Sequence, residues 1–136
     1  MTLPPLKGHR SLEGIAIMLE FKHYVFDMTS TELPNDRTPV VEYIRYRVPS
    51  EGAADFVTAY RAAAVGLRAS PYCLGYELAC CVEERDRFVL RIQWTSVDDH
   101  LNGFRRSPQF REFYAHIAPY VDRIDEMQHY SPELAG

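Results

Sequence analysis

The chain has 136 residues, of which 46% are hydrophobic and 25% charged, with a formal net charge of −4. This length suits one compact domain, and the composition is too apolar for a disordered chain. Lysines and arginines are scattered and form no basic patch, so neither a nucleic acid nor an acidic membrane surface is an expected partner.

The N-terminal region shows no basic segment followed by a long apolar core, so no secretory signal is predicted. Its most apolar stretch, residues 15–21, is far shorter than the roughly 20 apolar residues that span a bilayer. We therefore expect a cytoplasmic protein. Cys73, Cys80 and Cys81 lack the spacing of a zinc site, and no metal is predicted.

Residues 1–39 are predicted to be an N-terminal extension and linker, since their apolar pattern fits helix or strand and a polar, proline-containing stretch follows. The folded domain is predicted to span residues 40–136. β-branched and aromatic residues predict a strand over 40–48. Ser50 is expected to cap the next helix, whose apolar stripe contains Phe56, Tyr60, Ala63, Ala64 and Leu67.

Residues 73–82 and 87–94 alternate apolar and polar side chains and predict a hairpin. One face of its first strand is expected to carry Leu74, Tyr76, Leu78, Cys80 and Val82. The matching face of its second strand is expected to carry Phe88, Leu90, Ile92 and Trp94.

Two further helices and a strand complete the predicted domain. Ser96 and Asp99 have the spacing of a capping box and predict a short helix with Phe104 on its apolar side. Ser107 followed by Pro108 begins another helix, which carries Tyr114 on its stripe. Pro119 should distort its last turn, and residues 123–130 form the final strand.

The order β-α-β-β-α-β predicts an α+β, ferredoxin-like fold with one antiparallel sheet and helices on one of its faces. The other face would carry a mixture of aromatic and charged side chains, among them Tyr43, Arg45 and Arg91. That mixture favours pairing of two sheets in a homodimer over open contact with solvent.

Three segments are similar to the antibiotic biosynthesis monooxygenase family: the strand ending in Val48-Pro49 with its helix, residues 70–78 (SPYCLGYEL), and residues 88–110, which contain FVLRIQWTSVDDH and SPQF. The resemblance implies a dimeric α/β barrel with one cleft per subunit. It also implies oxidation of a phenolic, quinol or polycyclic aromatic substrate by O2 without a cofactor. Haem-degrading relatives use an Asn on the first strand, which residues 40–48 lack.

A cofactor-free oxygenase needs a base, because a phenolate gives electrons to O2 more readily than a phenol does. Histidine titrates near neutral pH, so His100 is the predicted base. Trp94 is the second predicted catalytic residue, whose ring could lie against a flat aromatic substrate and whose N–H could bond an oxygen. Tyr76, Tyr114, Leu90 and Phe104 are the predicted substrate-binding residues.

Other interpretations stay open. Trp94 and Tyr76 can simply pack in the core, and His100 can bond a carbonyl group. An isomerase or cyclase of the same fold could use the same histidine for proton transfer. The third alternative is a protein that binds aromatic small molecules without converting them.

Overall fold

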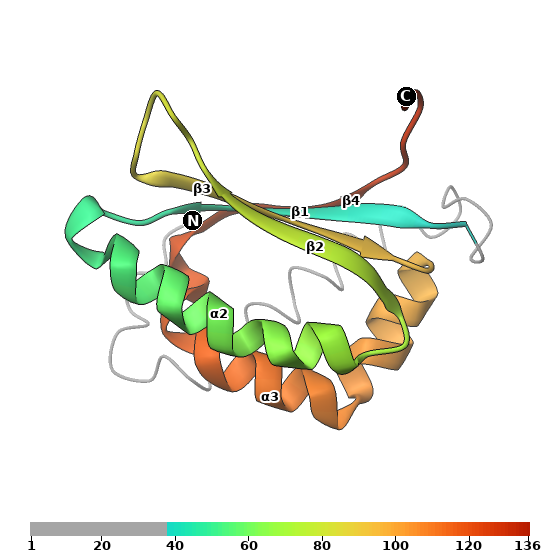
Figure 1. The fold of residues 1–136 in the computed structure, drawn as a ribbon. Helices are drawn as coiled ribbons and strands as arrows, with labels where there is room; N and C mark the ends of the chain where they lie inside the picture. Colours follow the sequence, from blue (N-terminus) through green and yellow to red (C-terminus); the bar gives the residue numbers. More distant parts are fainter. Residues whose placement is uncertain (1–37) are drawn as a thin grey trace.

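A computed structural model of the chain describes residues 38–136 (Figure 1). Four antiparallel strands form one sheet in the order β2-β3-β1-β4. The strands are β1 (Val40–Arg47), β2 (Cys73–Cys80), β3 (Arg87–Trp94) and β4 (Ile124–Tyr130). Helices α2 (Ala53–Ala69) and α3 (Pro108–Ile117) lie on the same face of this sheet. The predicted ferredoxin-like α+β fold is confirmed; the predicted extension lies almost wholly outside the described residues.

The side chains of β1 alternate between the two faces of the sheet. Val40, Glu42, Ile44 and Tyr46 are all buried beneath the helices. On the other face Arg45 and Arg47 are exposed and Tyr43 is half-buried. Because β1 lies between β3 and β4, its buried residues occupy the centre of the core, and Ile44 pairs with Leu90 on β3 and Met127 on β4.

The helices complete this core with aromatic side chains. Phe56 on α2 contacts the rings of Tyr46, Tyr60 and Phe88, at centroid distances of 4.8, 5.3 and 4.9 Å. Two hydroxyl groups are buried with these rings, those of Tyr46 and Tyr60, and they hydrogen-bond each other. A buried hydroxyl that finds a partner avoids most of its desolvation cost.

Two predicted details were wrong. Ser50 does not cap α2 with its side chain; a 3-10 turn over Ser50–Gly52 precedes the helix, which begins at Ala53. β2 ends at Cys80, and the register with β3 shifts between Cys73 and Gly75. This irregularity of an edge strand leaves Leu74 57% exposed, and Val82 beyond the strand is 78% exposed.

The predicted caps after β3 are present. Ser96 Oγ accepts the Asp99 N–H at 2.9 Å, and Ser107 Oγ accepts the Phe110 N–H at 3.3 Å. Between them lie a π-helical turn (Asp99–Gly103) and a 3-10 turn (Phe104–Arg106). After α3 a 3-10 segment over Ala118–Arg123 contains Pro119, as expected for a proline at the end of a helix. Within residues 38–136 no helix has the length and hydropathy needed to cross a membrane.

Candidate functional site

Polar side chains gather between the sheet and the helices at one end of β1, β3 and β4. Trp94 is the last residue of β3 and is fully buried, and its Nε1–H donates to Glu42 Oε1 at 3.0 Å. Glu42 lies on β1 directly opposite His129 of β4. Three neighbouring strands therefore contribute an indole, a carboxylate and an imidazole to one group of side chains.

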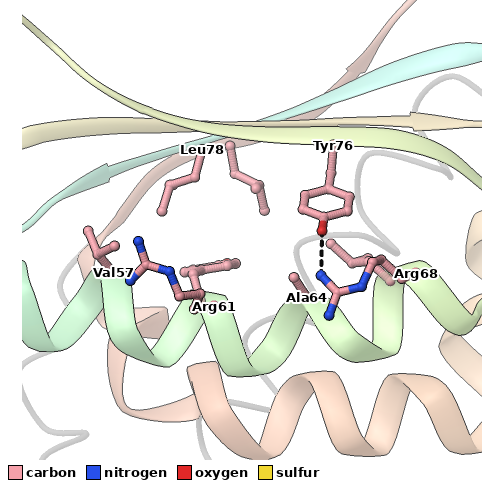
Figure 2. A pocket seen from close by; sticks show the side chains of 9 residues that line it. Val57, Arg61, Ala64, Arg68, Tyr76 and Leu78 are labelled. Atoms are coloured by element: carbon pink, nitrogen blue, oxygen red, sulfur yellow. Dashed lines mark hydrogen bonds between the residues drawn. The ribbon is translucent and has the colours of Figure 1, made fainter.

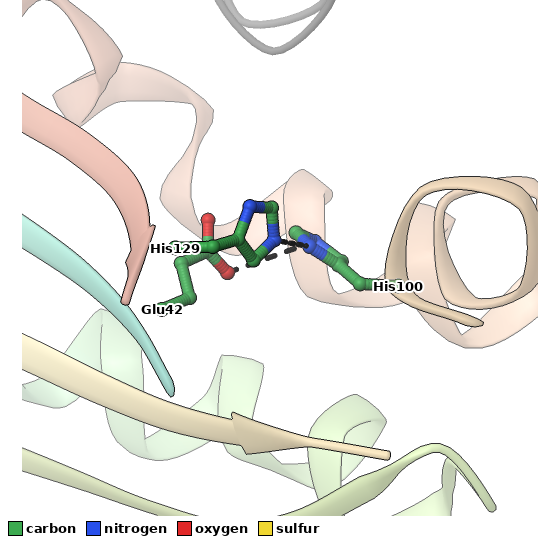
Figure 3. A group of neighbouring side chains, drawn as sticks. All are labelled: Glu42, His100 and His129. Atoms are coloured by element: carbon green, nitrogen blue, oxygen red, sulfur yellow. Dashed lines mark hydrogen bonds and ion pairs between the residues drawn. The ribbon is translucent and has the colours of Figure 1, made fainter. Parts of the chain in front are cut away.

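His100, in the π-helical turn, packs against Trp94, Glu42 and His129 (Figure 3). Its ring stacks on the Trp94 ring, with centroids 4.2 Å apart and planes 6° from parallel. Its Nδ1 hydrogen-bonds His129 Nε2 at 2.8 Å, while its Nε2 lies 3.6 Å from Glu42 Oε1. Only 3% of His100 is exposed. A π-helical turn is rare, and such turns are frequent at functional sites.

His100 and Trp94 were predicted from the sequence as site residues, whereas Glu42 and His129 were not. A signal for Glu42 was present: it alternates with Val40, Ile44 and Tyr46, so the strand pattern directs a carboxylate inward. An acid on the buried face of a strand needs a partner. His129 follows Met127 at the same spacing, but the sequence does not fix the register that places His129 opposite Glu42.

These three residues also form a group that could hold a metal ion. Glu42, His100 and His129 each bring one ligand atom within 4.8 Å of the others, and two imidazoles with a carboxylate suit first-row transition metals. In the structure, His100 Nδ1 and His129 Nε2 hydrogen-bond each other. Glu42 is also attracted to the charge of Arg105. The same three side chains could therefore share a proton or hold a metal ion.

Aromatic rings extend from Trp94 towards α3. Phe104 lies 4.9 Å from Trp94 and 5.6 Å from Phe110, and Phe110 lies 5.7 Å from Tyr114. Burial raises the pKa of Tyr114 to about 12, against the opposing effect of the Arg105 charge, so its hydroxyl is a donor at neutral pH. The predicted residues His100, Trp94, Phe104 and Tyr114 thus belong to one chain of ring contacts.

The other two predicted binding residues, Tyr76 and Leu90, lie elsewhere. They line a cavity of about 220 Å³ between α2 and the β2 side of the sheet (Figure 2). Tyr76 is 38% exposed, and its hydroxyl accepts a hydrogen bond from Arg68 Nη1 at 2.7 Å. This cavity shares no lining residue with the group around Trp94, and it is smaller than the roughly 300–1,000 Å³ of ordinary ligand pockets.

Comparison with known proteins places this architecture in a family. Residues 39–116 match the family model described as antibiotic biosynthesis monooxygenase. This chain belongs to the antibiotic biosynthesis monooxygenase family. Among curated proteins, the uncharacterized protein YczJ of Bacillus subtilis (strain 168) is 26% identical over 76 residues, which is 56% of this chain and 80% of YczJ.

Solved structures of other proteins share the fold. A Bordetella bronchiseptica protein, proposed to be an antibiotic biosynthesis monooxygenase, superposes with a TM-score of 0.60 at 24% identity, over 71% of this chain and 99% of that one. SnoaB, a cofactor-independent oxygenase from Streptomyces nogalater, superposes with a TM-score of 0.54 at 16% identity, over 72% and 96%. At these identities the likeness concerns the fold alone.

Proposed function

We propose that this protein is a cofactor-independent monooxygenase that oxidises a phenolic, quinol or polycyclic aromatic substrate with O2. The observation that carries the proposal is the buried imidazole of His100, held between the face of Trp94 and the side chains of Glu42 and His129. A base needs a defined position and a route for the proton it accepts. This arrangement supplies both, and SnoaB provides a cofactor-independent oxygenase of the same fold.

In the proposed reaction the substrate hydroxyl, or the acidic C–H of an anthrone, loses its proton to the imidazole pair. His129 is half-buried and His100 is buried, so His129 is the end of the pair that faces the substrate and passes the proton to His100. The electron-rich anion then reduces O2. For an anthrone, one oxygen atom is added to the ring carbon, and the other leaves as water with the two hydrogens of that carbon.

Oxygen uptake by the full chain against anthrones, naphthohydroquinones and catechols tests this proposal. His100→Ala and His129→Gln should each lower turnover by about 10²-fold or more, in the range of general-base contributions. His116→Gln, an exposed histidine on α3, is the matched control and should keep full turnover. Treatment with a chelator should also leave turnover unchanged.

Each contrary result has a definite meaning. Full turnover by His100→Ala would remove His100 from the mechanism. Loss of uptake after chelation would show that the Glu42, His100 and His129 group works by holding a metal ion. Product formation without oxygen uptake would favour an isomerase or cyclase. A raised KM in Tyr76→Phe would indicate that the substrate reaches into the cavity beside α2.

We also infer that the uncovered face of the sheet is the contact surface of a homodimer. Within residues 38–136 the helices lie against the other face (Figure 1), and the Tyr43 ring stands edge-on to Tyr130 at 5.0 Å between Arg45 and Arg91. Sedimentation velocity should give about twice the monomer mass of 15.7 kDa for the wild type. Tyr43→Ala should move the protein towards the monomer, because it removes an aromatic contact from the centre of the proposed interface.

A further inference from the structure

Arg105 is a buried cation without a hydrogen-bond partner. It lies in the 3-10 turn that follows the π-helical turn of His100. Within the described residues none of its three guanidinium nitrogens is exposed and none has a hydrogen-bond partner. Its guanidinium lies over the Phe110 ring at 4.7 Å. Buried charges are normally paired, so a guanidinium left in this state points to a missing acceptor.

Tyr114 is a second side chain whose buried polar group lacks a partner. Its hydroxyl is buried and, among residues 38–136, has no hydrogen-bond partner. Its ring contacts the Phe110 ring that also carries the Arg105 guanidinium. At neutral pH the guanidinium offers only donors, and the phenol, which keeps its proton, adds an O–H donor. Such a pair matches a ligand with a negatively charged oxygen.

This pair of donors is connected to the proposed active site. Phe104 precedes Arg105 in the chain, and its ring contacts both Trp94 and Phe110. The charge of Arg105 also interacts with Glu42, the carboxylate beside His100. An aromatic ligand that follows this line of rings would bring its oxygen to Arg105 and its reactive hydrogen to the imidazole pair.

We propose that Arg105 and Tyr114 form an oxyanion site that binds the ionised oxygen of an aromatic phenolate or enolate. This inference rests on the proposed function, since the anion is the species that reacts with O2. In surroundings of low dielectric constant a fixed cation stabilises the anion strongly and lowers the pKa of the bound phenol. Arg105 thereby makes the proton transfer to His129 and His100 favourable.

The test uses 2-hydroxyanthraquinone, a ligand already at the oxidised level, whose neutral and anionic forms differ in visible absorption. A pH titration of the bound ligand measures its phenol pKa, and quenching of Trp94, the single tryptophan of the chain, measures its affinity. On wild-type protein the phenol should ionise about one pH unit or more below the free ligand. Arg105→Gln should abolish this shift and weaken binding of the anion about tenfold or more.

Matched variants separate charge from structure. Arg106→Gln removes an exposed arginine next in the chain and should change nothing. Arg105→Lys should keep part of the lowering of the ligand pKa. Tyr114→Phe should reduce that lowering by less than Arg105→Gln does. Binding of 2-methoxyanthraquinone, which cannot ionise, should be equal in wild type and Arg105→Gln. If Arg105→Gln does not fold, Tyr114→Phe and Arg105→Lys still decide the question.

An unchanged ligand pKa in folded Arg105→Gln would overturn the proposal. Because this measurement needs no O2 and no turnover, it is independent of the proposed monooxygenase activity. A pKa shift that depends on Arg105 in a protein without oxygen uptake would keep the oxyanion site and reject the oxygenase. Oxygen uptake without such a pKa shift would keep the oxygenase and reject the oxyanion site.

Discussion

The group around Trp94 and the cavity beneath α2 lie against the same face of one sheet, yet they hold their polar side chains differently. In the cavity, Arg68 and Tyr76 are exposed and bond each other across the opening. Around Trp94, the side chains of Glu42 and His100 are at most 4% exposed. Polar groups at a surface cost little, whereas burying them costs free energy unless each finds a partner. Buried and mutually interacting titratable groups of this kind cluster at functional sites, which is why the proposed activity is assigned to the second region.

The largest expected difference between the two regions concerns stability. Trp94→Ala removes a fully buried indole that holds Glu42 and stacks on His100, and it should lower the free energy of unfolding by about 3–5 kcal/mol. Tyr76→Ala removes a half-exposed ring at the edge strand and should cost about 1 kcal/mol or less. Urea denaturation of both variants measures the two values. Equal losses of unfolding free energy in the two variants would show that the group around Trp94 is no more important for stability than the exposed edge of the cavity.

Much of the fold could be predicted because local patterns and global packing agree. Residues 87–94 alternate apolar and polar side chains, and this segment became β3 with the predicted bounds. The caps at Ser96 and Ser107 were predictable because each depends on residues three positions apart. The edge strand was less predictable, since the bulge near Gly75 depends on pairing with β3 and not on the local pattern.

The candidate site was only partly predictable for the same reason. His100 and Trp94 are six residues apart in the chain, whereas Glu42 and His129 are 87 residues apart and meet only in the sheet. The burial of Arg105 could not be read from the sequence, since Arg105-Arg106 looks like an ordinary pair of surface charges. Only packing shows that the first is enclosed and the second exposed.

A smaller effect on stability is expected from the buried pair Tyr46 and Tyr60. Tyr60 lines the cavity beneath α2, and its hydroxyl hydrogen-bonds that of Tyr46 in the core. Burial raises the pKa of both tyrosines above 10 in the folded protein. The unfolded chain therefore releases these protons at lower pH than the folded one. Their contribution to stability is complete below pH 10 and is lost as the pH rises from there, by up to about 1.4 kcal/mol per pH unit for each tyrosine.

The double variant Tyr46→Phe/Tyr60→Phe separates this pair from the other tyrosines. It removes both buried hydroxyls together, so neither is left without a partner, and its loss of stability above pH 10 should be shallower than that of the wild type. Tyr46→Phe alone should cost about 1–3 kcal/mol at neutral pH, because it leaves the Tyr60 hydroxyl buried and unsatisfied. Urea denaturation between pH 7 and 11 gives the curves of the wild type and of both variants, and a double variant with the wild-type slope would show that other groups control alkaline unfolding.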